Sequence, residues 1–234
     1  MAKKLIKWLG ILGFLISSGL LLVAWPQGGK VRAQFGLAWG VIILWIIVGG
    51  LLTLWLRNFF RRRLGDRQMH WQRRFVIFAT VLALIEEAIT TLMTNLAPAF
   101  GVKLGEVYIT ASTDYLDVVF FHSVIKFVPM FIILAWLLKY YDFNANQLFL
   151  IFGATGLLAE IGFGGIQNIL NPGFWFFVYG LMVYLPAYCL PSRPTAKPPR
   201  WRHYLLTIIL PILGGILISF PIKAIHPVDV HFPL

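Results

Sequence analysis

The chain has 234 residues, of which 59% are hydrophobic and only 12% carry a charge. Soluble domains contain about 25% charged and about 45–50% apolar residues, so this composition excludes a soluble globular protein. The formal net charge of +11 would suit a nucleic-acid binder, but the positions of the basic residues favour a membrane topology signal, and we expect no nucleic-acid partner. We predict an all-α integral protein of a lipid bilayer.

Apolar runs long enough to cross about 30 Å of hydrocarbon, with about 20 residues in each, follow one another along the chain. The sequence does not alternate in polarity as the strands of a membrane β-barrel do. The proline-rich stretch 189–201 is the only linker-like composition, so the whole chain, 1–234, is predicted to be one helical-bundle domain. About seven transmembrane helices are expected, at 5–25, 36–56, 75–97, 116–138, 147–170, 172–190 and 204–222.

The first run follows Lys3, Lys4 and Lys7, which is the layout of a signal peptide. Its apolar part is long for a cleaved signal. The nearest small-residue cleavage sequence, VRAQ at 31–34, comes only after WPQGGK at 25–30. We therefore expect the run to remain as a first transmembrane helix.

Lys and Arg residues gather in alternate connections between the apolar runs. Fifteen of the 20 precede the first run or lie in the second, fourth and sixth connections, four lie on the opposite side, and Lys126 falls inside a run. Short loops rich in Lys and Arg remain in the cytoplasm. The pattern predicts a multi-pass protein of the plasma or inner membrane, with its N-terminus in the cytoplasm and its C-terminus outside.

The third run contains two adjacent glutamates in the sequence LALIEEAITTLMTN, residues 82–95. A charged group inside the bilayer is costly and usually faces the bundle interior or a water-filled cavity. At helical spacing, each glutamate begins a row of polar side chains along the helix, and the two rows are neighbours. The rows suit a hydrated groove, and they equally suit threonines that bond back to helix carbonyls. One row carries Glu86, Thr90 and Thr94, and the other carries Glu87, Thr91 and Asn95.

The fourth and fifth runs also carry ionisable residues. In the fourth, His122 and Lys126 are four residues apart and share a helix face. In the fifth, Glu160 lies on a stripe of small and polar residues that falls within about 40° of it. Such a stripe allows close helix packing and hydrogen bonds across an interface, so it is a packing face alone or part of a polar site. Its members are Gly153, Gly156, Glu160, Gly164, Gln167 and Asn171.

The depths of these groups agree under the predicted topology. At about 1.5 Å per residue, Glu86, Lys126 and Glu160 lie roughly 15 Å below the outer ends of their helices. His122 lies higher, at roughly 9 Å. We therefore predict one three-helix polar site that opens to the outside, where crowded carboxylates share a proton and suit acid–base work or proton coupling. The predicted catalytic residues are Glu86, Glu87, His122 and Glu160, and the predicted substrate contacts are Lys126, Gln167, Asn168, Asn171, Thr91 and Asn95.

Adjacent glutamates in one membrane helix, a histidine in the next and an asparagine further on resemble the CAAX-protease and bacteriocin-processing (CPBP) family of intramembrane glutamic proteases. The matching positions are Glu86 and Glu87, His122, and Asn168 or Asn171. The resemblance implies glutamates and histidines that activate a water molecule to attack a peptide bond. The chain has Thr90 and Thr91 where the family has an arginine, and Val118 where its second motif has a phenylalanine. Gly164 or Gln167 stands at the position of the family's second membrane histidine.

Three functions are compatible with such a site. The first is an intramembrane hydrolase acting on a peptide or lipid, with Glu86 or Glu87 as base and His122 within hydrogen-bond reach of a glutamate. The second is a proton-coupled transporter or channel, with helices broken near GFGG (162–165) or NPG (171–173). The third is a non-catalytic subunit, chaperone or receptor of a membrane assembly, in which Lys126 pairs with a glutamate.

Metal and cofactor chemistry has little support in the sequence. Cys189 is the only cysteine, which excludes an internal disulfide and a multi-cysteine metal site. Three residues of the C-terminal tail, His226, Asp229 and His231, offer metal-ligand types. We interpret them as members of a tail without fixed geometry, and we expect neither a metal nor a cofactor.

Overall fold

The computed structural model describes residues 1–65 and 70–226, and its regular structure within these ranges is entirely helical. The predicted all-α class is therefore confirmed. The main helices are α1 (Ala2–Ala24), α2 (Gly29–Val41), α3 (Gly50–Gly65), α4 (Trp71–Asn95), α6 (Val124–Leu138), α7 (Ala145–Gly164), α8 (Pro172–Tyr188) and α9 (Trp201–Ile225). Shorter segments are η1 (Trp25–Gln27), η2 (Ile42–Gly49), η3 (Ala97–Phe100), α5 (Tyr115–Asp117), η4 (Val118–His122) and η5 (Ile166–Leu170).

Five helical segments of the described chain are long and apolar enough to cross a membrane. They are α1 with η1, the continuous unit of α2, η2 and α3, then α4, α7 and α9. A sixth arises if the pair Tyr115–His122 and Val124–Leu138, bent by 45°, is one span. The expected helix at 172–190 falls short, because the 17 residues of α8 are fewer than the about 20 needed. The structure thus supports a polytopic fold with five or six spans.

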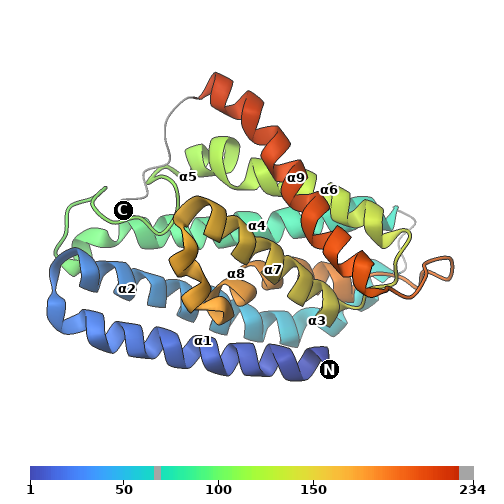
Figure 1. The fold of residues 1–234 in the computed structure, drawn as a ribbon, viewed down its shortest axis with the longest axis horizontal. Helices are drawn as coiled ribbons and strands as arrows, with labels where there is room; N and C mark the ends of the chain where they lie inside the picture. Colours follow the sequence, from blue (N-terminus) through green and yellow to red (C-terminus); the bar gives the residue numbers. More distant parts are fainter. Residues whose placement is uncertain (66–69, 227–234) are drawn as a thin grey trace.

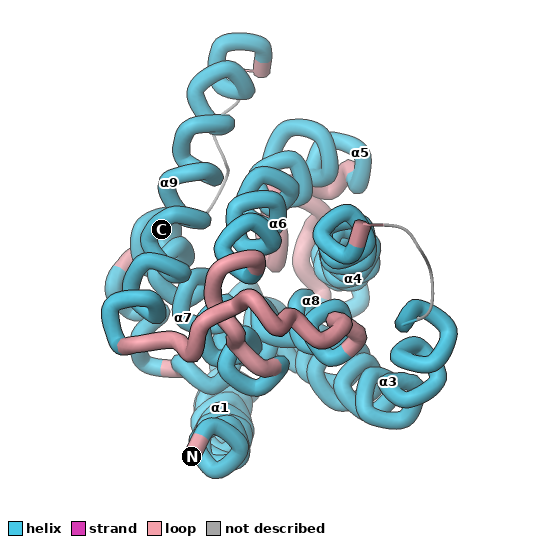
Figure 2. The backbone as a smooth tube through the Cα atoms, turned by 90° about the vertical axis from the view of Figure 1, so that its right-hand side faces the viewer, coloured by secondary structure: helices cyan, strands magenta, loops and turns pink. Residues whose placement is uncertain are grey.

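The helices form an elongated bundle with α8 at its centre (Figures 1 and 2). Viewed along the bundle, α8 is surrounded by neighbours, and it packs against α7, α1, α4 and α3. α9 lies across α6 and α7, and its last turns project beyond the rest of the bundle (Figure 1). This arrangement buries α8 and exposes the outer helices.

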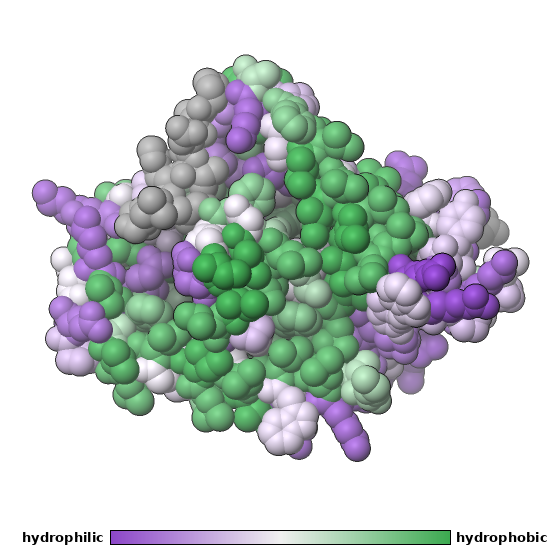
Figure 3. Space-filling model, in the orientation of Figure 1, coloured by the Kyte–Doolittle hydropathy of each residue, from purple (hydrophilic) through white to green (hydrophobic). Residues whose placement is uncertain are grey.

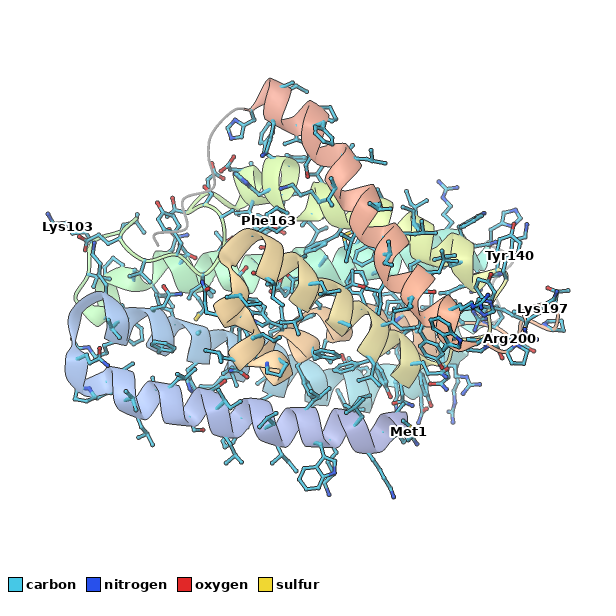
Figure 4. All side chains as sticks on the ribbon, in the orientation of Figure 1. Met1, Lys103, Tyr140, Phe163, Lys197 and Arg200 are labelled. Carbon is cyan, nitrogen blue, oxygen red and sulfur yellow. The ribbon has the colours of Figure 1, made fainter. Side chains whose placement is uncertain are left out.

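The exposed surface has the polarity of a membrane protein. A broad apolar zone covers the middle of the molecule, while polar residues gather toward the two ends (Figure 3). We call these the Met1 end, where Tyr140, Lys197 and Arg200 also lie, and the Lys103 end (Figure 4). Many large apolar side chains are exposed, among them Trp55, Leu158 and Leu217. Such a surface is stable where lipid replaces water.

The α7–α8 hairpin turns back near the middle of the molecule. Phe163, close to the end of α7, lies roughly midway between the two ends (Figure 4). The helix stops at Gly164, earlier than the expected residue 170, because Gly165 has a φ of +96° that favours glycine. After the short η5 helix, Pro172 opens α8, and the Asn171 side chain accepts a hydrogen bond from the Phe174 N–H. Two chain breaks, at GFGG and at NPG, thus shape the hairpin.

Glycines set the distance between α8 and its neighbours. A Cβ atom on Gly153 or Gly156 of α7 would overlap the Phe176 backbone or the Tyr179 side chain. A Cβ atom on Gly173 would stand 2.2 Å from the Leu9 carbonyl oxygen of α1. The glycine stripe of the fifth run is therefore a packing face, as one of the two sequence interpretations held.

The connection between α8 and α9 is fixed by Arg193, whose side chain is only 8% exposed. Its guanidinium donates to the carbonyls of Leu138 and Phe143, both at 2.9 Å, and pairs with Asp142 at 2.7 Å. The loop backbone adds a hydrogen bond from the Asp142 N–H to the Lys197 carbonyl. The proline-rich segment is therefore bound to the end of α6.

Arg193→Ala is expected to release this loop. A hydrogen bond to a charged group contributes about 1.5–3 kcal/mol, and this change removes several of them. Limited proteolysis with proteinase K should then cut the 190–200 segment at least several times faster than in the wild type. Arg202→Ala is the matched control, because Arg202 is exposed and stacks only on Trp201. Equal cleavage of the two variants would contradict the anchoring role.

Candidate functional site

Three glutamates form a carboxylate cluster inside the bundle. Glu86 and Glu87 of α4 are buried, with 4% and 5% of their surface exposed, and Glu160 of α7 is partly exposed. The charges of Glu87 and Glu160 bear on Glu86. The Tyr179 hydroxyl of α8 lies near all three carboxylates and donates a hydrogen bond to Glu160. The structure thus brings these three predicted site residues into one neighbourhood of the bundle.

Glu87 is held by hydroxyl groups from two directions. Its Oε2 accepts hydrogen bonds from Thr90 Oγ1 of the same helix at 3.1 Å and from Thr110 Oγ1 at 2.9 Å. The Ser123 hydroxyl lies beside the same carboxylate. Glu86, in contrast, accepts no hydrogen bond from the side chains or backbone of the described residues. The two neighbours are thus chemically distinct, one fixed in place and one with free oxygen atoms.

Thr110 belongs to the long connection between η3 and α5, which folds back onto α4. The N–H groups of Ile109 and Thr110 donate to Thr94 Oγ1 at 3.0 and 3.3 Å, and Tyr115 donates to the Leu84 carbonyl. This connection covers the cluster from the Lys103 end (Figure 4). It supplies one of the two hydroxyl donors to Glu87.

An ion pair fixes the outer part of this connection. Glu106 accepts a hydrogen bond from the Lys103 N–H at 2.8 Å and pairs with Lys30 of α2 at 3.6 Å. The Lys103 N–H, with the charge of Lys30, lowers the pKa of the exposed Glu106 carboxyl. Since both side chains are largely solvated, the pair contributes little to stability.

Lys126 does not neutralise a glutamate. Its ammonium group lies over the Phe163 ring, 5.5 Å from the centroid, and within residues 1–65 and 70–226 it has no carboxylate partner at ion-pair distance. The expected lysine–glutamate pair is therefore wrong for the described structure. Lys126 projects toward the end of α7. There its ammonium group makes a cation–π contact in place of an ion pair with a glutamate.

His122 belongs to a second group of residues, at some remove from the glutamates. Its Nε2 lies 3.3 Å from Asp117 Oδ2, while His226 Nε2 lies 2.8 Å from Asp117 Oδ1. We call Asp117, His122 and His226 the imidazole cluster. Within the described chain, His122 has no glutamate within hydrogen-bond reach. The expectation of a glutamate–His122 contact is thus wrong, because the π-helical turn of η4 directs His122 toward Asp117 and α9.

His226 also corrects the interpretation of the tail. It caps the end of α9, contacts Asp117, and packs its ring on Phe121 with centroids 4.4 Å apart. The expectation of a tail without fixed geometry is therefore wrong at His226, whose side chain has defined contacts. Asp229 and His231 lie outside the described residues.

The polar residues expected to contact a substrate mostly bond within the protein. Asn95 donates to the carbonyls of Thr91 and Thr113. Asn168 donates to the Glu160 carbonyl and closes the end of α7. Gln167 is exposed and donates to the Gly164 carbonyl. Asn171 donates to Ser17 of α1 at 2.8 Å. The buried hydroxyl of Thr91 has no partner within the described residues.

Sequence reasoning missed Thr110, Tyr179 and Asp117 as members of these clusters. Thr110 lies in an irregular connection, for which helical spacing gives no orientation. Tyr179 sits in an aromatic-rich run in which its hydroxyl carries no distinguishing signal. Asp117 lies five residues before His122, which fits one turn of a π-helix but not the ordinary helical spacing of three or four.

Comparisons with protein-family models, with curated proteins and with solved structures found no match to this chain. The fold and the site by themselves define its class. It is a polytopic all-α protein of the membrane type with a buried carboxylate cluster and a separate imidazole cluster.

Proposed function

We propose that the protein is an intramembrane hydrolase whose acid–base centre is the carboxylate cluster. The observation that carries this proposal is the convergence of Glu86, Glu87 and Glu160 without an ion-pairing Lys or Arg in the described chain. Uncompensated carboxylates in a low-dielectric interior are costly and are retained chiefly where they function. Neighbouring carboxyl groups that share a proton provide both a base and an acid.

The surroundings of each carboxylate favour a particular role. Glu86, with oxygen atoms free of hydrogen bonds, takes a proton from a water molecule as the water oxygen attacks a substrate carbonyl carbon. Glu160, bonded to Tyr179, gives a proton to the leaving nitrogen or oxygen as the bond to carbon breaks. Glu87, held by Thr90 and Thr110, orients the water. The reaction consumes one water molecule. Both glutamates return to their starting states when a proton passes from Glu86 to Glu160.

The substrate class follows from the site's location. A carboxylate cluster within an apolar bundle suits a substrate carbonyl group with apolar flanks, such as that of a membrane-inserted peptide or an acylated lipid. The basic residues near the Met1 end favour a plasma or inner membrane protein with that end in the cytoplasm. In this orientation, the connection that carries Thr110 covers the site on the outer side.

Transport of protons or small cations is a second candidate, favoured by one specific observation. The α7–α8 hairpin is broken between Gly164 and Pro172 near the middle of the molecule. Helices that break at mid-depth, beside carboxylates, are typical of ion-coupled transporters. Under this function the same glutamates bind the ion.

Hydrolysis in heavy-oxygen water tests the first proposal. The purified protein, reconstituted with membrane peptides and lipids, should produce new carboxylates that carry one heavy oxygen atom, detected by mass spectrometry. Vesicles with an internal pH dye report transport in the same preparation. Label in the products supports the hydrolase, whereas pH movement without labelled products supports the transporter.

His122→Ala is expected to leave hydrolysis within about threefold of the wild type. His122 touches Asp117 and not the carboxylate cluster, so it makes no contact with the groups to which we assign acid–base roles. Initial rates of label incorporation measure the effect. A loss of more than about 100-fold, the scale of a lost acid–base group, would instead favour the glutamate–histidine mechanism of the CPBP family.

A further inference from the structure

The imidazole cluster has the composition of a transition-metal site. One ligand atom from each of Asp117, His122 and His226 can be chosen so that all three lie within 4.8 Å of one another. Two imidazoles and one carboxylate are a ligand set for zinc and related divalent metals. The three residues come from α5, η4 and the end of α9, so tertiary structure and not sequence spacing brings them together.

The residues are held firmly enough to form a site. His122 is 5% exposed, and Asp117 places one carboxylate oxygen toward each imidazole, at 3.3 and 2.8 Å. Phe121 packs against the His226 ring and fixes its plane. In a zinc complex with bonds of about 2.0–2.1 Å, ligand atoms are roughly 3.4 Å apart. Small side-chain rotations therefore suffice to bring the three ligands around one ion.

His122 can bind an ion through its Nε2 atom, which faces Asp117 Oδ2. Its Nδ1 is buried and has no hydrogen-bond partner in the described chain. An imidazole binds metal through a nitrogen that carries no proton. An ion on Nε2 therefore replaces the contact of this nitrogen with the Asp117 carboxylate and leaves the proton of the neutral imidazole on Nδ1.

One negative and one positive side chain bear on the His122 imidazole. Lys126 lies one turn from His122 and its charge bears on the imidazole, but its ammonium group is engaged over the Phe163 ring. Asp117 supplies a compensating negative charge between the two histidines. Three protein ligands leave a position for water.

We propose that Asp117, His122 and His226 bind one divalent transition-metal ion, with zinc as the expected occupant. The ion joins His226, the residue that caps α9, to η4 and so ties the projecting end of α9 to the bundle. This site is separate from the carboxylate cluster, and the proposal does not depend on hydrolysis.

Zinc titration of the full-length protein tests the proposal. The protein, freed of any histidine tag and held in detergent, is titrated with zinc alone in a calorimeter. We expect one equivalent to bind, and Asp117→Asn, His122→Gln and His226→Gln each to weaken binding by at least about 10-fold. Asp117→Asn and His226→Gln are mild changes at partly exposed positions, so they remain informative if the buried His122 variant fails to fold.

Two controls separate this site from other ligands. His203→Ala removes a histidine near the Met1 end, and the double variant Asp229→Asn, His231→Ala removes the tail residues that could bind zinc with His226; both should bind zinc as the wild type does. Absence of saturable binding, or binding unchanged in the three site variants, would overturn the proposal. Loss of binding in the tail variant alone would overturn it equally. Since calorimetry needs no substrate, its result is independent of the proposed hydrolase.

Discussion

Replacing Glu86, the proposed base, with glutamine is expected to reduce hydrolysis by about 10²–10⁴-fold, the contribution typical of a general acid or base, and Glu87→Gln should also reduce it, because the carboxylate that orients the water is lost. Glutamine keeps the size of each side chain but can neither take nor share a proton. For Glu87, the hydroxyls of Thr90 and Thr110 can still donate to the amide oxygen. The local fold should therefore remain while the rate of heavy-oxygen incorporation falls.

Glu106→Gln is the matched control, because it removes a carboxylate that is exposed and lies outside the cluster. Its hydrolysis rate should equal that of the wild type. Size-exclusion profiles of all variants show whether each has folded. A Glu86→Gln protein that is folded and hydrolyses at the wild-type rate would exclude the acid–base role of Glu86, and a Glu87→Gln protein that does so would exclude the orienting role of Glu87.

Gly173→Ala is expected to give the largest loss of stability among single-methyl substitutions in the bundle. The new Cβ would stand 2.2 Å from the Leu9 carbonyl oxygen and 2.6 Å from the Gly13 Cα atom. Both are backbone atoms, so a side-chain rotation cannot relieve the overlap, and α1 must move away from α8. Overpacking of this kind costs about 1–3 kcal/mol, which corresponds to a fall of roughly 2–10 °C in the unfolding midpoint for a chain of this size.

Gly19→Ala provides the comparison for this change, because a Cβ on Gly19 of α1 meets no atom within 4 Å. Alanine there should leave the unfolding midpoint unchanged or raise it slightly, since alanine is the better helix former. The midpoint is measured by the thermal loss of the monodisperse peak in detergent. Equal midpoints for the two variants would show that α1 and α8 do not approach closely at Gly173.

Helical periodicity predicted the features that depend on one helix at a time. The glycine stripe of α7 and the burial of Glu86 and Glu87 follow from which residues share a face. Apolar run length gave the helices, including α8, although α8 is too short to count as a span. These features are local, so a single sequence contains the information.

Features that depend on how helices meet could not be read in this way. The contact of His226 with Asp117 joins residues 109 positions apart, and Thr110 reaches Glu87 from an irregular connection. Lys126 was expected to pair with a glutamate from depth alone, but depth does not specify the direction in which a side chain projects. The position of Phe163 on the neighbouring helix decided its partner.

The central claim is that the carboxylates of α4 and α7 form one acid–base site. Infrared titration of the carboxyl bands in the wild type and in Glu160→Gln tests it directly, with Glu106→Gln as control. If the three glutamates interact, loss of Glu160 should move the titration of the remaining buried carboxyl groups by more than about one pH unit, and the control should not. Buried carboxyl bands that titrate identically with and without Glu160 would contradict the claim.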